Sequence, residues 1–501
     1  MSSPSTRETL ANEIWNACDV LRRDNNCGGV MEYVEHLSWL LFLRFLDAQE
    51  EEWETQAELR GEDYEPILPE EYRWSSWAQK DWEADDLVGF VHGKLIPHLR
   101  ALGGDPLRET ISGIFSDRNV VVCASGYNLK DVIGVLNQVD FHNQDDIFTV
   151  GQVYEDLLRK LGNENRLAGE FYTPRPVVRF IVQLVNPQIS ETVYDPACGT
   201  CGFLAEAYAL MQEQEKTTED RRTLQEETFF GQEKKALPAL LGTMNLVLHG
   251  VTAPTVRRRN TLEENIRNVT ERFDVVVTNP PFGGTEARQI QQNFPVQVQA
   301  TEILFLQHIM KKLKPREGAR CGIVVPEGTL FRTGSFTDVK KDLLKQFDLH
   351  TVVSLPPGTF APYSDVKTGL LFFDRPGPTE EIWYYELPLP KGLKKFSKGS
   401  PIQDEHLDKA RELWSQWNAY RHGEADRPEA TDHSWIVPAE DIKERNYDLT
   451  ARNPNRPEGE ELPMPMEIVA SLAEKEREIL SIVQELDELL GNGENEGSEQ
   501  E

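Results

Sequence analysis

Apolar residues recur at helical spacing in the first part of the chain. In residues 7–23 they return every three or four positions, which places them on one face of a helix. Residues 31–53 are apolar on most faces of a helix, so we expect that helix to be buried in a core. A third helical pattern covers residues 150–162 and ends on a glycine. Together these patterns predict a helical N-terminal domain over residues 1–165.

The pattern changes in the middle of the chain, where short apolar runs alternate with helical patterns. The runs are residues 191–195, 273–278, 321–326, 350–355 and 367–374. Strands that alternate with helices are typical of an α/β fold with a parallel sheet. Uninterrupted valine runs within them fit strands that are buried on both faces. We therefore expect an α/β domain over residues 166–400, followed by a polar, helical C-terminal region over residues 401–501.

Composition and charge narrow the class of protein. The chain has 501 residues, of which 39% are hydrophobic and 27% charged, which is enough apolar content for several packed cores. The first residues lack a secretion signal, and the longest apolar run is far shorter than a membrane span. Six scattered cysteines do not form a disulfide framework, so we expect a soluble protein of a reducing cytoplasm. A net charge of −31 argues against DNA binding through the general surface.

A glycine-rich turn follows the first predicted strand of the α/β domain. The segment Asp195-Pro-Ala-Cys-Gly-Thr-Cys-Gly-Phe203 opens into a helical pattern, and Gly199 and Gly202 permit a tight turn and close approach of a ligand. No Lys-Ser/Thr pair follows, so the turn is not a P-loop. Alone it is a weak signal, because many α/β domains have such turns. Cys198 and Cys201 have no second Cys/His pair nearby in the sequence, so we interpret them as small packing residues and expect no metal.

A second motif, Asn279-Pro280-Pro281-Phe282, directly follows the strand predicted over residues 273–278. Two prolines cannot continue a central strand. They leave backbone carbonyls and the Asn279 side chain at the carboxyl end of the sheet. An isolated motif of this kind fits a proline-rich capping turn equally well. Downstream of a glycine-rich turn in an α/β segment, a functional interpretation is favoured.

The two motifs together resemble those of amino-group DNA methyltransferases. DPACGTCGF resembles their S-adenosylmethionine motif and NPPF their catalytic motif, and GEFYTPRPVV at 169–178 resembles the preceding segment of the γ-ordered N6-adenine group. The order HLSWLLFLRFLD, YEDLLRKL, GEFYTP, DPACGTCGF, NPPF, VVPEGTLF, LPPGTF and NYDL is similar to that of the modification (methylation) subunit of type I restriction–modification systems. The resemblance covers nearly all of the chain. It implies a Rossmann-like, S-adenosylmethionine-dependent methyltransferase domain between helical N-terminal and C-terminal regions.

The resemblance also implies a cofactor site for S-adenosyl-L-methionine. Its residues would be Gly169, Glu170, Phe171, Tyr172, Thr173, Pro174, Asp195, Pro196, Gly199, Thr200, Cys201, Gly202, Glu233, Asn260 and Thr261. In this assignment Glu233 accepts the ribose hydroxyls, and a long polar stretch at 211–227 explains its distance along the chain from Asp195. A solvated acid at a helix start is the alternative for Glu233, and an N-cap is the alternative for Asn260.

The catalytic residues implied are Asn279, Pro280, Pro281 and Phe282. A sulfonium methyl is already electrophilic, whereas the lone pair of adenine N6 is delocalised into the ring. The Asn279 Oδ1 atom and the Pro280 carbonyl can accept the N6 hydrogens and draw the nitrogen toward tetrahedral geometry. The adenine must leave the duplex to reach them, and Phe282 offers a stacking surface for the flipped base.

Partners follow from the same resemblance. It implies a specificity subunit bound by two copies of this chain, a restriction/translocation subunit, and double-stranded DNA, with no membrane. The heptad-like pattern at 469–490 predicts a helix that either docks the specificity subunit or, equally, packs on its own domain. The polar residues that follow it predict a disordered tail. The basic cluster Arg257, Arg258 and Arg259 fits either a phosphate contact or a solvated turn.

Two alternatives to this function remain open: a stand-alone N-P-P-[YF] methyltransferase acting on DNA or protein glutamine, and a non-catalytic scaffold that retains the fold.

Overall fold

The structure is a computed structural model that describes residues 7–27, 29–61, 63–104, 106–116, 122–139, 141, 173–251, 254–361 and 364–455. Residues 1–451 form one compact unit, and residues 452–501 are separate from it. The helix predicted over 150–162, the site residues 169–172, the heptad pattern and the predicted tail all lie outside the described residues. Within the described ranges, no helix combines the length and apolar character needed to cross a membrane.

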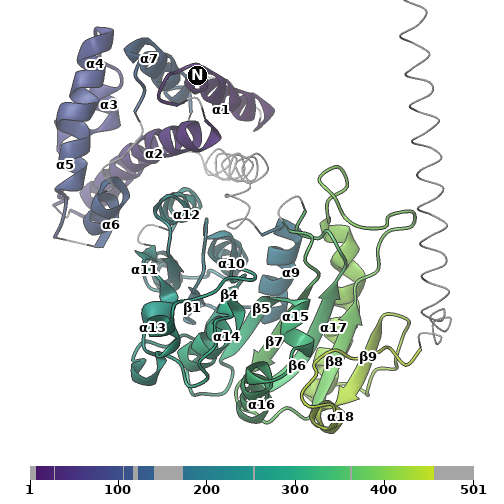
Figure 1. Cartoon of the computed structure of the whole chain (residues 1–501). Helices are drawn as coiled ribbons and strands as arrows, with labels where there is room; N and C mark the ends of the chain where they lie inside the picture. Colours follow the sequence, from purple (N-terminus) through teal and green to yellow (C-terminus); the bar gives the residue numbers. More distant parts are fainter. Residues whose placement is uncertain are drawn as a thin grey trace, which may run out of the picture. The chain divides into compact units, whose positions relative to one another are not determined.

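The first part of the chain is helical, as its periodicity predicts (Figure 1). Its helices are α1 (Arg7–Leu21), α2 (Val30–Arg60), α3 (Trp74–Trp77), α4 (Ala84–Phe90), α5 (Ile96–Arg100), α6 (Pro106–Phe115) and α7 (Gly126–Leu136). The 31-residue helix α2 contributes the largest group of buried side chains, including Trp39 and Phe42. It ends at Gly61, whose left-handed backbone conformation (φ +70°) suits glycine. The predicted buried helix is therefore confirmed.

The second part of the chain is a nine-stranded sheet (Figure 1). Its strands are β1 (Val193–Asp195), β2 (Phe229–Glu233), β3 (Thr255–Arg258), β4 (Val275–Thr278), β5 (Arg320–Pro326), β6 (Asp348–Leu355), β7 (Thr368–Asp374), β8 (Glu381–Glu386) and β9 (Ser434–Pro438). Their spatial order is β3-β2-β1-β4-β5-β7-β6-β8-β9. Each apolar run identified in the sequence forms one of these strands.

The predicted α/β fold is confirmed, but its sheet is mixed and not parallel throughout. Strand β7 runs antiparallel to both β5 and β6, and β9 runs antiparallel to β8. A parallel neighbour needs a crossover connection, usually a helix. The chain instead passes from β6 to β7 through a segment whose described residues form turns and extended backbone. The sheet also extends past residue 400 through β9. The division into residues 1–165, 166–400 and 401–501 stays a prediction.

Helices cover both faces of the sheet. Helices α9 (Arg175–Val185), α10 (Gly202–Gln212) and α17 (Asp408–Arg421) contribute to the apolar core on one face. Helices α14 (Thr301–Lys312), α16 (Ser335–Gln346) and α18 (Ala439–Glu444) contribute to the core on the other. The remaining helices of this part are α11 (Thr218–Glu226), α12 (Ala236–Leu248), α13 (Arg288–Gln291) and α15 (Glu327–Phe331). Alternate valines of β4 enter the two cores, which confirms that this strand is buried on both faces.

The order of strands brings the two sequence motifs together. Strands β1 and β4 are parallel neighbours, with Val193 opposite Val275. The glycine-rich turn leaves the carboxyl end of β1, and the Asn-Pro-Pro-Phe motif leaves the carboxyl end of β4. In open α/β sheets this edge is where ligands bind.

Candidate active site

The glycine-rich turn between β1 and α10 is held tightly against the neighbouring strand β2. The Cys198 backbone N–H donates to the Gln232 carbonyl at 3.0 Å, and the backbone is left-handed at Gly199 (φ +50°) and Cys201 (φ +58°). A Cβ atom on Gly242 of α12 would lie only 2.7 Å from the Cys201 Sγ atom. Both cysteines of this turn are buried free thiols. Their contacts fit the packing interpretation of the Cys-x-x-Cys pair.

Asp195 links the ends of the two central strands. Its Oδ1 atom accepts hydrogen bonds from the Thr278 hydroxyl on β4 at 2.6 Å and from the Ala197 backbone N–H at 3.0 Å. Its Oδ2 atom is buried but has no hydrogen-bond partner within the described part of the chain. Burial raises the pKa of Asp195 to about 7, and the negative charge of Glu233 adds to the effect. One carboxylate oxygen therefore links the two strand ends, and the described residues leave the other without a hydrogen bond.

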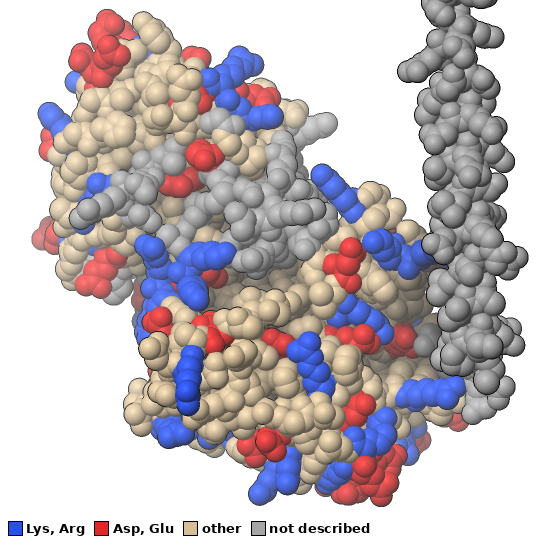
Figure 2. Space-filling model, viewed as in Figure 1, with Lys and Arg blue, Asp and Glu red and all other residues tan. Residues whose placement is uncertain are grey.

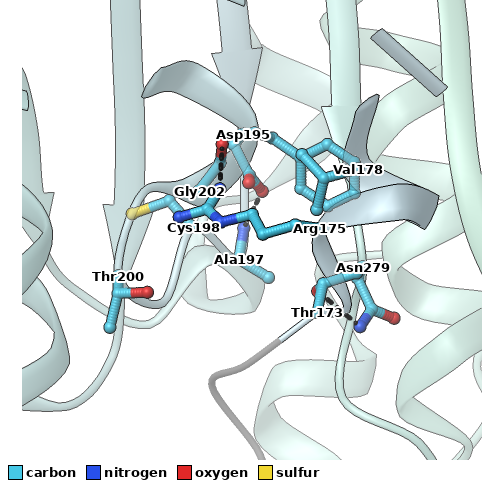
Figure 3. A pocket seen from close by; sticks show the side chains of 10 residues that line it. Thr173, Arg175, Val178, Asp195, Ala197, Cys198, Thr200, Gly202 and Asn279 are labelled. Carbon is cyan, nitrogen blue, oxygen red and sulfur yellow. Dashed lines mark hydrogen bonds between the residues drawn. The ribbon is translucent and has the colours of Figure 1, made fainter. Parts of the chain in front are cut away.

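Asn279 is held in one orientation by a residue from the segment that precedes α9. Its side-chain Nδ2 donates to the Thr173 hydroxyl at 2.9 Å, while its Oδ1 atom is buried without a hydrogen-bond partner among the residues that the structure describes. Figure 3 shows the Asn279 amide beside Thr173, with its oxygen pointing away from that contact. The donor end of the amide is occupied, and the acceptor end remains available for a hydrogen-bond donor.

These side chains line one pocket (Figure 3). The lining residues are Thr173, Arg175, Val178, Asp195, Ala197, Cys198, Thr200, Gly202, Phe203 and Asn279. The structure thus brings together five residues that the sequence assigned to the site: Thr173, Asp195, Thr200, Gly202 and Asn279. Arg175 was missed, although it directly follows the predicted Pro174. Its guanidinium donates to the Gly202 carbonyl at 2.9 Å and so ties α9 to the first residue of α10.

Glu233 and the residues assigned to the adenine lie beside the glycine-rich turn and outside that lining. Glu233 ends β2 and accepts hydrogen bonds from the backbone N–H groups of Gly199 at 3.1 Å and Lys235 at 2.8 Å. It is 8% exposed, and burial raises its pKa, so the alternative of a solvated acid is wrong. The Asn260 side chain accepts from the Leu262 backbone N–H at 3.2 Å as an N-cap. The Thr261 hydroxyl donates to the Pro196 carbonyl at 2.5 Å, so Thr261 is in direct contact with the glycine-rich turn.

The remaining residues of the second motif extend from Asn279 along the surface. Pro280 is buried and Pro281 is exposed. Phe282 is half-buried and meets the Phe360 ring edge-on, with ring centroids 5.7 Å apart and an interplanar angle of 80°. Its position is thus fixed by an aromatic neighbour. The cofactor and catalytic roles given to these residues stay predictions.

Charges near the site do not form a single basic surface. Arg257 of the predicted basic cluster makes a bidentate ion pair with Glu271, with N–O distances of 2.7 and 3.1 Å. Over the described residues of the face seen in Figure 2, Lys and Arg side chains are interspersed with Asp and Glu. This distribution agrees with the net charge of −31 and offers no continuous track for a DNA backbone on that face.

Two family models match the chain. The model described as N-6 DNA Methylase matches residues 143–461, and the model described as HsdM N-terminal domain matches residues 10–136. Together they account for both the sheet and the N-terminal helices.

Similar proteins agree with the family models. The EcoEI methylase subunit of a type I restriction enzyme from Escherichia coli is 39% identical over 96% of this chain and 98% of its own length. The EcoKI methylase subunit from Escherichia coli K12 is 30% identical over 87% of this chain and 80% of its own length. A solved chain from a study of complex assembly and conformational transition of the type I R-M system is 74% identical, with a TM-score of 0.83 and coverage of 98% of this chain and 99% of that one.

Proposed function

Because this chain belongs to the N-6 DNA methylases, and among them to the methylase subunits of type I restriction enzymes, we propose that it methylates adenine N6 in DNA, with S-adenosylmethionine as methyl donor. The observation that carries the proposal is the Asn279 side chain, whose Nδ2 donates to Thr173 and whose buried Oδ1 accepts no hydrogen bond from any described residue. An acceptor of this kind suits the exocyclic amino group of a base. We further propose that residues 1–165, 166–400 and 401–501 are the helical, methyltransferase and docking regions.

The residues of the pocket fit S-adenosylmethionine. The buried Oδ2 atom of Asp195, which has no partner in the described ranges, suits a ligand with cationic and hydrogen-bond-donating groups. Thr173, Asp195, Thr200 and Gly202 would hold the methionine part, Glu233 the ribose hydroxyls, and Asn260 and Thr261 would border the adenine ring. When bound, the cofactor supplies an electrophilic sulfonium methyl group.

The chain's own groups would prepare the adenine amino group. Asn279 Oδ1 and the Pro280 carbonyl accept the two N6 hydrogens, which favours tetrahedral geometry at the nitrogen and stabilises the positive charge that develops there. Thr173 keeps the Asn279 oxygen directed away from the protein's own donors. Phe282, braced by Phe360, provides a face on which the flipped base stacks. Fixed placement of the nitrogen relative to the methyl group then supplies much of the rate.

We assign recognition of the DNA sequence to a specificity subunit bound by two copies of this chain, with a restriction/translocation subunit in the larger complex. The net charge of −31 and the interspersed charges of Figure 2 support an assignment in which another chain supplies most contacts to phosphate. The 74% identical chain, which comes from a study of type I complex assembly, supports the same view.

The test is methyl transfer by the chain reconstituted with its specificity subunit, with labelled S-adenosylmethionine and duplex DNA. Asn279→Ala is expected to abolish transfer while cofactor binding, measured by calorimetry, is retained. Asn418→Ala on α17 is the matched control and should leave transfer unchanged. Retained turnover by Asn279→Ala would remove its proposed role. Transfer to a protein without DNA would favour a glutamine methyltransferase, and no transfer by the wild type under any condition would favour a non-catalytic scaffold.

A further inference from the structure

Two cysteine thiols and one imidazole converge in the N-terminal helical part, away from the pocket between β1 and β4. Cys27 lies in the turn between α1 and α2, His36 lies on α2, and Cys123 lies just before α7. One ligand atom from each side chain lies within 4.8 Å of the other two, and the Cys123 Sγ atom is 3.1 Å from His36 Nε2. All three residues are 0% exposed.

Hydrogen bonds on either side of the cluster fix the two cysteine segments against each other. The Asn26 side chain donates to the Val122 carbonyl at 3.1 Å. The Asp24 carboxylate accepts from the backbone N–H groups of Ala124 at 2.8 Å and Ser125 at 2.9 Å. The residues that flank Cys27 and Cys123 are therefore bound directly to one another. This arrangement holds the two thiols in place before any ligand binds, which lowers the entropic cost of binding.

From this convergence we propose that Cys27, His36 and Cys123 form a binding site for a thiophilic metal ion of the Zn²⁺ class. Two sulfur ligands and one imidazole nitrogen are the donors that such ions prefer, whereas Mg²⁺ and Ca²⁺ prefer oxygen. Two thiolates and a neutral imidazole would balance the charge of a divalent ion. The loaded site would then carry no net charge, as a fully buried position requires.

Binding is coupled to ionisation of the thiols. A cysteine thiol must lose its proton to become a metal ligand, because the thiolate is the form that binds the metal. On binding, Cys27 and Cys123 each release one proton to solvent, and each forms a metal–sulfur bond, while His36 coordinates through Nε2 without a change of charge. The ion would link the α1–α2 turn, α2 and the segment before α7. Because the three ligands are inaccessible in the folded chain, the ion enters as these helices assemble.

The experiment measures metal content in the full chain, purified under reducing conditions without chelators from cells grown with added Zn²⁺. Elemental analysis is expected to find about one zinc ion per chain in the wild type. Cys123→Ser should lose the ion, whereas Cys18→Ser, which alters another buried cysteine of the same helical core, should retain it. Equal zinc content in wild type and Cys123→Ser, with both folded by circular dichroism, would overturn the proposal.

A second measurement needs no variant and so does not depend on the folding of Cys123→Ser. Wild-type chain produced in cells grown with Co²⁺ in place of Zn²⁺ should show thiolate-to-cobalt charge-transfer absorption. Absence of the charge-transfer band, with cobalt present in the medium, would overturn the proposal. So would a Cys27–Cys123 disulfide, found by peptide mapping under non-reducing conditions in chain that was purified without reductant. Neither measurement depends on methyl transfer.

Discussion

The hydrogen bond between Thr173 and Asn279 gives the sharpest test of how the pocket is organised. Thr173→Val keeps the shape of the side chain and removes the hydroxyl that accepts from Asn279 Nδ2 at 2.9 Å. The Asn279 amide then loses the hydrogen bond that fixes its orientation. We expect slower methyl transfer with little change in fold, because Thr173 is half-buried and its backbone precedes α9.

The size of the effect follows from a single neutral hydrogen bond. Such a bond contributes about 0.5–1.5 kcal/mol net. If the whole contribution serves to orient Asn279 in the transition state, kcat should fall about 2- to 13-fold, since about 1.4 kcal/mol corresponds to a tenfold change in rate. The loss should be smaller than that of Asn279→Ala, because the acceptor itself remains.

The assay is steady-state methyl transfer to duplex DNA by the reconstituted complex, together with calorimetric binding of S-adenosylmethionine. Thr173→Ser is the control, because it retains the hydroxyl and should retain most of the rate. A positioning role requires that kcat falls more than cofactor affinity. If Thr173→Val equals the wild type, or if the valine and serine variants are slowed equally, the hydroxyl does not orient Asn279 for catalysis.

Three further predictions concern stability and the stacking surface. Burial raises the pKa of Asp195 from an ordinary 3.8 to about 7, so the stability that this carboxyl adds to the cofactor-free protein is present below about pH 4 and is lost as pH rises to about 7. In urea unfolding, the free energy of unfolding of Asp195→Asn should therefore lack this fall between pH 4 and pH 7. An unchanged dependence on pH would contradict the prediction. Burial alone would raise the pKa of Asp274, but hydrogen bonds from Lys314 and Thr192 outweigh burial and lower the pKa to about 2. The stability that the Asp274 carboxylate adds to the fold is therefore present above about pH 4 and is lost as pH falls toward 2. Asp274→Ala should lower the free energy of unfolding, measured in urea at neutral pH, by about 1–3 kcal/mol. This is less than the loss expected for a fully buried ion pair, because Lys314, the partner of Asp274, is partly exposed. An unchanged free energy of unfolding would show that the Asp274–Lys314 ion pair does not stabilise the fold. Phe282→Ala should lower kcat/KM for DNA about 5- to 160-fold, from about 1–3 kcal/mol of base stacking, whereas Phe282→Tyr should not; equal values for all three proteins would exclude stacking.

Local sequence was sufficient to find the main strands and both motifs. Short apolar runs marked β1, β4, β5, β6 and β7, because burial on both faces favours consecutive apolar residues over strict alternation. Strands β2, β3, β8 and β9 were not among the identified runs, although the Ile-Trp-Tyr-Tyr run of β8 is a signal that could have revealed that strand. The antiparallel direction of β7 depends on which neighbours it joins, and the periodicity of a strand carries no direction.

The sequence by itself determined the helical first part, the alternation of strands and helices, and the chemical groups available at the two motifs. These depend on the period of apolar residues and on the backbone limits of glycine and proline, which act within a few positions. Only the tertiary structure decided which groups meet. It joined Thr173 to Asn279 across 106 positions, left one oxygen of Asp195 without a partner among the described residues, and gathered Cys27, His36 and Cys123 in one core. Such contacts depend on how distant segments pack, and no local pattern along the chain records that.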